Sequence, residues 1–255
     1  MTGYTPTTFQ IRTYRSFEPT EISGIKLWLD AGDLTGIDGS SVNSWLDKSG
    51  NNAHFNQTTV AYQPILKTNQ LNSRNVVRFD GVNDFLTSTD ITKNNILTNV
   101  GGASIIAVIK YPISIFQVDA VFISSGTGAT RASLIKRTTN FLAMTNRRLD
   151  ADTQVVLTSN FTSSVNFFIQ LGIFDYANAY GFLYINGYKN IENLSYGTIG
   201  STSNTDSTIF TIGASTGNFL NGDIAEVMVF NRVLTTLEIT NVNEYLSRKY
   251  NLTLA

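Results

Sequence analysis

The chain has 255 residues, a formal net charge of -1 and no cysteine. Without cysteine it can form neither a disulfide framework nor a thiolate metal site. Its balanced charge indicates no clustered basic surface for nucleic acid, and no apolar run approaches the roughly 20 residues of a membrane-spanning helix. The first residues also lack the charged start and apolar core of a secretory signal. We therefore expect neither a nucleic-acid partner nor a membrane span.

Residues 1–23 are predicted to form an extended arm. Apolar residues are spaced here among Thr, Gln and Arg, and two prolines limit regular strand pairing. The apolar positions are Phe9, Ile11, Tyr14 and Phe17, and the prolines are Pro6 and Pro19. Two interpretations stay open, because the arm can lie across its own domain or dock onto a partner by strand addition.

Residues 24–255 are predicted to form one all-β domain. Short Val, Ile and Phe runs alternate with Thr, Ser, Asn and Gly, which is typical of many strands joined by tight turns. The expected strands cover residues 25–29, 76–79, 104–109, 120–123, 141–144, 155–157, 167–174, 181–185, 209–212 and 223–230. Turn dipeptides separate several of them, and the clearest hairpin turn is Asn186 with Gly187.

One short helix is predicted after the last strand. Thr235 stands three residues before Glu238, which is the spacing of a capping box, and Leu234 with Ile239 forms a hydrophobic staple. Its apolar stripe should pack on the sheets, and its last turn carries cations where the helix dipole favours them. The stripe is Ile239, Val242 and Leu246, and the cations are Arg248 and Lys249.

Six segments together resemble the concanavalin A-like lectin/glucanase superfamily. They are GIKLWLDAGD (24–33), WLDKSGNN (45–52), VVRFDG (76–81), DFL (84–86), GDIAEVMVFN (222–231) and YLSRKY (245–250). More narrowly, they resemble laminin G-like domains of bacterial surface proteins and of phage or other viral particles. The resemblance runs in order from residue 24 to 250 and implies a jelly-roll sandwich of two curved antiparallel sheets.

Several conspicuous residues have structural interpretations. We expect Trp28 and Trp45 to pack as large core aromatics rather than as sugar-stacking platforms. Asp47 should close a turn through hydrogen bonds to the backbone. The single histidine, His54, is expected to be structural and to lie in a strand, since no second His or Cys accompanies it.

Asp80, Asn83 and Asp84 have two interpretations. The simpler is a hairpin connection, and the other is a calcium site, because carboxylate and amide oxygens clustered in a loop suit a hard cation. The resemblance adds that laminin G-like relatives often bind calcium. Calcium is the only cofactor that we consider.

Catalysis is not expected. Glucanases of the superfamily carry an acidic run of the Glu-X-Asp-X-Glu type, and this chain has none. Asp150 and Asp152 lie in a charged segment that is typical of a solvated loop. Asp223 and Glu226 are three residues apart, which places them on opposite faces of a regular strand. We therefore expect a protein that is not an enzyme.

The candidate ligand-binding residues are aromatic and amide side chains near predicted loops. They are Tyr176, Asn178, Tyr180, Tyr188 and Tyr196. Such side chains offer planar faces and hydrogen-bonding groups to sugars, but tyrosines are also frequent at the edges of sheets. Both interpretations stay open.

The preferred functional hypothesis is a non-catalytic, virion-associated protein, acting in capsid decoration or in tail adhesion. Its arm would bind other virion or assembly proteins, and its lectin-like sandwich would bind cell-surface glycans. The expected location is the virion surface, with the extracellular space or a bacterial cell surface as alternatives, and a homo-oligomer is compatible with it. A purely structural cementing protein and a glycan hydrolase are the alternative functions.

Overall fold

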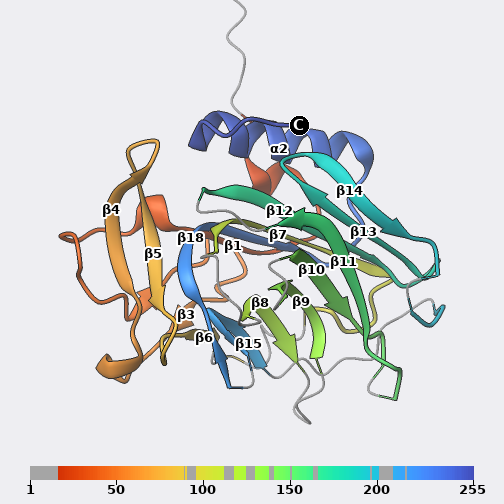
Figure 1. The fold of residues 1–255 in the computed structure, drawn as a ribbon, viewed down its shortest axis with the longest axis horizontal. Coiled ribbons are helices and arrows are strands. Elements are labelled where there is room, and N and C mark those ends of the chain that lie inside the picture. Colours follow the sequence, from red (N-terminus) through yellow and green to blue (C-terminus); the bar gives the residue numbers. More distant parts are fainter. Residues whose placement is uncertain are drawn as a thin grey trace, which may run out of the picture.

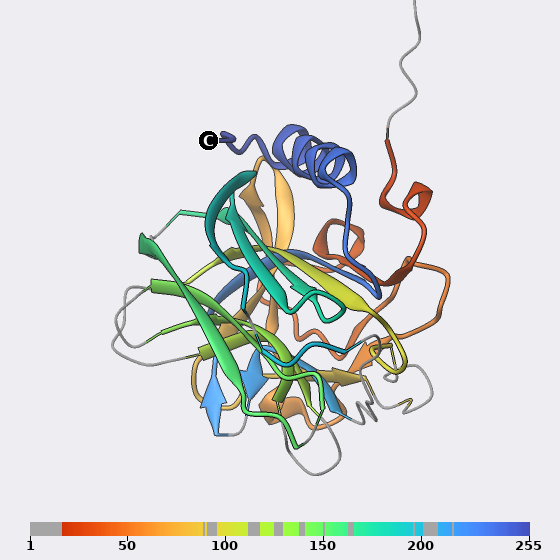
Figure 2. The same ribbon diagram turned by 90° about the vertical axis from the view of Figure 1, so that its right-hand side faces the viewer.

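A computed structural model describes residues 17–88, 90, 96–111, 118–124, 130–137, 141–149, 151–162, 166–195, 197–200, 209–215 and 217–255. In the part of the chain that is described, two large antiparallel sheets face each other, and a helix of 15 residues lies on the outer face of one of them (Figures 1 and 2). The predicted all-β sandwich with a short C-terminal helix is confirmed. In the described part of the chain, no helix has both the length and the apolar character needed to cross a membrane.

The sheet covered by the helix is called the helix-side sheet. Its strands, in spatial order, are β14 (Tyr188–Asn193), β13 (Tyr180–Ile185), β12 (Phe168–Asp175), β7 (Gly102–Lys110), β18 (Asn221–Phe230), β5 (Arg74–Asp80) and β4 (Ile65–Leu71). β1 (Ile25–Asp30) pairs with the C-terminal half of β18, beyond the part that pairs with β5. The last strand before the helix therefore lies in the middle of this sheet.

The opposite sheet is built from shorter strands. They are, in order, β11 (Val155–Thr162), β10 (Phe141–Asn146), β9 (Thr130–Lys136), β8 (Val118–Ser124), β15 (Ile209–Ile212), β6 (Leu86–Ser88), β3 (Phe55–Asn56) and β2 (Ser44–Trp45). β16 (Ala214–Ser215) and β17 (Asn218–Phe219) form a small hairpin, and η1 (Pro19–Glu21), η2 (Ala31–Asp33) and η3 (Val60–Tyr62) are single 3-10 turns. Every strand expected from the sequence coincides with one of these strands.

The helix-side sheet is buried on both faces, which explains the unbroken apolar run of β7. Ile105, Ala107 and Ile109 point into the core between the two sheets. Ile106 and Val108 point the other way and pack beneath the helix. A strand that is covered on both faces needs apolar residues at successive positions rather than alternating ones.

The helix α2 (Thr236–Tyr250) begins and packs as predicted. The backbone N–H of Glu238 donates to Thr235 Oγ1 at 3.3 Å, and that of Thr235 donates to the Glu238 carboxylate at 2.8 Å. Ile239, Val242 and Leu246 are all buried against the sheet. The helix ends at Asn251, whose φ of 53° is left-handed.

The structural interpretations of Trp28, Trp45 and Asp47 are confirmed. Both indoles are at most 4% exposed. The Asp47 carboxylate accepts the backbone N–H groups of Trp28 and Ala53, among others. His54 precedes β3 rather than lying in a strand, and its Nδ1 accepts the N–H of Asp47 at 3.0 Å.

Candidate functional site

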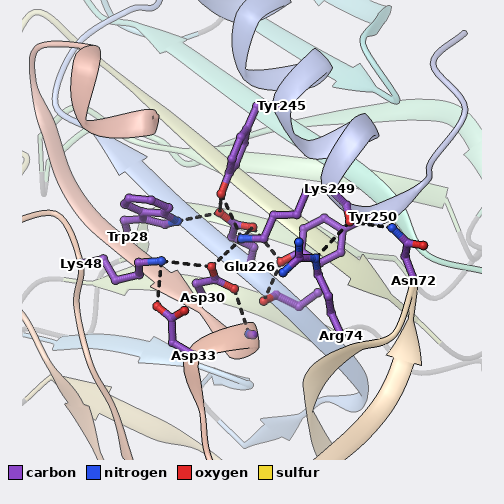
Figure 3. A network of polar contacts seen from close by, with 12 residues as sticks. Trp28, Asp30, Asp33, Lys48, Asn72, Arg74, Glu226, Tyr245, Lys249 and Tyr250 are labelled. Atoms are coloured by element: carbon purple, nitrogen blue, oxygen red, sulfur yellow. Dashed lines mark hydrogen bonds and ion pairs between the residues drawn. The ribbon is translucent and has the colours of Figure 1, made fainter. Parts of the chain in front are cut away.

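An open cleft of about 950 Å³ lies where the helix C-terminal half meets β1, η2 and the start of β5. The side chains that matter for its chemistry are Trp28, Asp33, Lys48, Arg74, Tyr245 and Lys249. Figure 3 shows that they come from elements far apart in the sequence and point toward a common centre. The cleft therefore exists only when the helix is docked on the sheet.

A buried carboxylate lies beneath the residues that line the cleft. Glu226, in the middle of β18, is 1% exposed and accepts four hydrogen bonds. Its Oε1 accepts Trp28 Nε1–H at 2.6 Å and the Tyr245 hydroxyl at 3.1 Å. Its Oε2 accepts Lys249 Nζ at 2.7 Å and the Tyr250 hydroxyl at 2.7 Å. A buried charge requires such partners, because an unpaired carboxylate in this place would be strongly destabilising.

Lys249 joins this carboxylate to a second one. Its ammonium lies 2.5 Å from Asp30 Oδ2, and Lys48 approaches the same oxygen at 3.2 Å. Burial would raise the pKa of Asp30, but Lys249 and Lys48 outweigh it, so the pKa of this carboxyl lies below its ordinary value. Burial raises the pKa of Glu226, and Lys249 only partly offsets that rise.

The aromatic rings of the cleft pack edge to face. The Tyr245 ring lies 6.4 Å from Trp28 and 6.0 Å from Phe17, in both cases with T-shaped geometry. Lys48 Nζ sits 4.2 Å from the centre of the Trp28 ring and covers it. The rings of Tyr245 and Phe17 thus remain as the partly exposed apolar wall.

The prediction that Asp223 and Glu226 lie on opposite faces of their strand is wrong. A bulge between Ile224 and Glu226 shifts the register against β7 by one residue. Asp223 pairs on the outer face with Arg78 and Lys110, at 2.6 and 2.5 Å, and Glu226 faces the helix beside it. Residues three positions apart lie on opposite faces only in a strand without a bulge.

This acidic pair is not arranged for catalysis. Both oxygens of Glu226 are taken by donors, and both carboxylates of Asp223 and Glu226 are 1% exposed. A general acid or base must reach a bound substrate within hydrogen-bond distance. Glu226 therefore stabilises the packing of the helix on the sheet, whereas Asp223 joins β18 to β5 and β7.

Arg74 is the cation of the cleft with spare donors. Its Nε donates to the carbonyl oxygen of Lys249 at 3.1 Å, and Asn72 Nδ2 donates to the same oxygen at 3.0 Å. Among the described residues, its terminal nitrogens have no hydrogen-bond or ion-pair partner. The hairpin between β4 and β5 thus holds the end of α2 and aims a guanidinium at the cleft.

The structure does not bring the predicted ligand-binding residues to one place. Tyr176 is 2% exposed in the core, and Asn178 is held in the β12–β13 turn by Asp175, at 3.1 and 2.9 Å. Tyr180 begins β13, whereas Tyr188 begins β14 after the hairpin turn at the other end. Tyr196 lies outside the described residues. Their role in binding stays a prediction.

Asp80, Asn83 and Asp84 do come together, in the turn after β5. Asp80 Oδ1 accepts the N–H of Val82 at 2.8 Å and that of Asn83 at 3.2 Å, and Asp84 Oδ2 accepts the N–H of Asp80. Burial and the nearby Asp80 raise the pKa of Asp84 to about 6. Within the described residues no group of three or more acidic, His or Cys side chains meets the requirements of a metal site. Calcium binding stays a prediction.

The arm is described only from Phe17 onward. Phe17 packs on Tyr245, and Ile22 is 4% exposed beneath the helix, so residues 17–23 pack on the domain itself. Phe9, Ile11 and Tyr14 lie outside the described residues. Whether the preceding arm binds a partner stays a prediction.

Sequence reasoning missed the cleft itself. Lys249 was expected only to favour the helix dipole, but its side chain is 8% exposed and bridges Asp30 and Glu226. The available signal was the presence of three charged residues inside segments that otherwise resemble buried scaffold. They are Asp30, Glu226 and Lys249. Nothing in the sequence indicated that the three meet.

No protein-family model and no curated protein matches this chain. The structure is similar to the ligand-binding domain of botulinum neurotoxin serotype D, solved with N-acetylneuraminic acid (TM-score 0.63, 15% identity, 87% of this chain and 50% of that chain). It is also similar to botulinum neurotoxin type C, whose cell entry is described as dependent upon interaction with two ganglioside molecules (TM-score 0.57, 16% identity, 89% and 52%). A third is Trypanosoma rangeli sialidase in complex with the inhibitor DANA (TM-score 0.57, 13% identity, 88% and 33%).

The chain therefore spans about half the length of the toxin domains and a third of the sialidase. At these identities the likeness shows a shared fold. We conclude that the chain has the two-sheet β-sandwich fold of these structures.

Proposed function

We propose that this protein is a non-catalytic, lectin-like module that binds glycans. The observation that carries the proposal is the sandwich fold, which it shares over 87% of its length with a toxin domain solved with N-acetylneuraminic acid. The open cleft supports it, because aromatic side chains beside charged and amide groups are the usual means of holding a sugar.

A glycan microarray tests this function directly. The labelled full chain is expected to bind at least one glycan class above background, with calcium and again with EDTA. Loss of binding in EDTA would support the calcium site at Asp80, Asn83 and Asp84. An array without any signal would contradict the glycan-binding function.

A hydrolase is the second candidate, because a sialidase is among the similar structures. The four donors around Glu226 argue against it. Cleavage of a polysaccharide or a sialoside that disappears in a folded Asp152→Ala or Glu226→Ala variant would establish this alternative.

We further propose that the module is displayed on a virion, with residues 1–16 as the attachment arm. The sequence pattern of Phe9, Ile11 and Tyr14 supports this, and Phe17 already packs on the domain. Truncation before Phe17 should leave the domain folded and abolish incorporation into the particle. If incorporation survives, the arm is not the anchor. Particle binding together with a blank glycan array would select a purely structural cementing role.

A further inference from the structure

We propose that Arg74 is the anchor of a carboxylate-binding subsite, and that the ligand class of the cleft is a sugar that carries a carboxylate. This inference rests on the proposed glycan-binding function and assigns it a place and a chemistry.

Among the described residues, Arg74 is the cation of the cleft without an ion pair, in contrast to Lys48, Arg248 and Lys249. Lys48 lies 2.7 Å from Asp33, Lys249 is shared between Asp30 and Glu226, and Arg248 pairs with Glu244 at 2.6 Å. No carboxylate among the described residues lies within ion-pair distance of Arg74. An anionic ligand would complete the pairing.

The guanidinium of Arg74 is held in a defined orientation. Its Nε bond to the Lys249 carbonyl fixes the plane of the group, and Asn72 holds the same oxygen from the adjacent turn position. Each terminal nitrogen keeps both of its N–H groups, and one from each nitrogen can point to the two oxygens of a single carboxylate. Such a bidentate arrangement is stronger and more specific than a contact with a point charge.

Other residues that line the cleft suit the hydroxyl groups and the apolar face of a sugar. Tyr245 and Phe17 present an apolar wall, and the Tyr245 ring cannot turn freely because its hydroxyl contacts both Glu226 and Lys249. Asp33 is 58% exposed and uses Oδ2 for Lys48, so that Oδ1 can accept a sugar hydroxyl. A ligand with a carboxylate, hydroxyls and an apolar face satisfies all three features.

The size of the cleft agrees with a short oligosaccharide. Ordinary ligand sites measure about 300–1,000 Å³, and this cleft measures about 950 Å³. Its position also makes binding dependent on the docked helix, because Tyr245 and the Lys249 carbonyl that orients Arg74 both belong to α2.

The test is calorimetric titration of the full chain with α2,3-sialyllactose and, as the matched neutral ligand, lactose. We expect the wild-type protein to bind sialyllactose and to bind lactose at least tenfold more weakly. Arg74→Gln should weaken sialyllactose binding by roughly 10- to 100-fold, since a charge-assisted hydrogen-bond pair is lost. Arg74→Lys keeps the positive charge but cannot make the bidentate contact, so it should lose an intermediate amount of sialyllactose affinity. It is the second variant if Arg74→Gln does not fold.

Arg248→Gln is the matched control, because it removes the same charge from the rim of the same cleft. Arg248 is 78% exposed and paired with Glu244, so its loss should change affinity less than twofold. Equal affinity of wild type and Arg74→Gln, or equal affinity for lactose and sialyllactose, would overturn the inference. So would displacement of bound sialyllactose by inorganic phosphate but not by free N-acetylneuraminic acid, since that identifies a phosphate site.

The two proposals can fail separately. Glycan binding on the array that persists in folded Arg74→Gln overturns the Arg74 subsite and leaves the lectin-like function standing. A wild-type chain that binds no glycan overturns both.

Discussion

Asp223 and Glu226 lie on the same, outer face of β18, although residues three positions apart lie on opposite faces of a regular strand. Ile224 and Val227 point into the core between the sheets, and Ala225 is the extra residue of the bulge, on the side of the helix. The bulge therefore places Glu226 on the same face as Asp223 and under α2.

Deleting Ala225 should be tolerated, because Asp223, Ile224, Glu226 and Val227 would then alternate regularly against β7. We expect a cooperatively folded protein destabilised by about 1–2 kcal/mol. Deleting Val227 is the matched control, since it turns either Glu226 into the core or every later residue of β18 to the wrong face, and should abolish folding. Circular dichroism melting curves distinguish the two. Equal behaviour of the two deletions would show that the bulge does not set the register.

Glu226→Gln should destabilise the protein by about 3 kcal/mol, because it leaves Lys249 buried with one of its two carboxylates missing. Urea unfolding measures the change. Glu192→Gln removes one partner of an exposed pair with Lys189 and should change the free energy of unfolding far less. Similar losses in both variants would contradict the structural role of Glu226.

Stability in acid should depend on Glu238. Its hydrogen bonds from Arg232 and from the backbone of Thr235 lower its pKa to about 2 from an unfolded value of 4.5. The stabilisation is therefore fully present above pH 4.5 and is lost as the pH falls toward 2. Glu238→Gln should lower stability at pH 7 by about 1 kcal/mol and flatten the fall of the melting temperature below pH 4.5. An unchanged acid profile would contradict this capping role.

Asp84 should act in the opposite direction. Its pKa is raised to about 6 in the folded chain from 3.8 unfolded, so its favourable contribution is present below pH 3.8 and is lost as the pH rises through 6. Asp84→Asn should stabilise the calcium-free protein at pH 7 by about 1 kcal/mol, which is less than the full pKa shift implies because solvent screens the group. The variant should have nearly unchanged stability at pH 3.5. Melting curves in EDTA at the two pH values test whether the substitution raises or lowers stability. Destabilisation at pH 7 would refute it.

Gly213 and Gly217 allow a matched test of how closely the chain packs at Gly213. Both have left-handed φ values, 87° for Gly213 and 79° for Gly217. A Cβ at Gly213 would lie 2.2 Å from the Phe79 ring, whereas one at Gly217 would meet nothing within 4 Å. Both Ala variants share the backbone strain, so Gly213→Ala should cost about 2 kcal/mol or more beyond Gly217→Ala. Equal costs in denaturant unfolding would contradict the close packing at Gly213.

Local signals in the sequence were sufficient for the C-terminal helix and for ten of the strands, but not for β4 and β9, which have seven residues each. The capping box of Thr235 and Glu238, the left-handed turn at Asn186 and Gly187, and the apolar run of β7 each depend on neighbours within a few residues. Asp47 is only partly local, since its carboxylate accepts the N–H of Ser49 in its own segment and also that of Trp28, 19 residues earlier. Short strands such as β2 and β3 carried too few residues for a pattern.

The sequence by itself determined an all-β sandwich closed by a capped helix, because alternation, turn residues and caps are short-range properties of the chain. Only the tertiary structure decided that Asp30, Arg74, Glu226 and Lys249 share one cleft. That meeting depends on a one-residue bulge and on the docking of α2 over β1 and β18. A shift of one residue reverses the face of a side chain without changing composition or propensity, so periodicity could not reveal it.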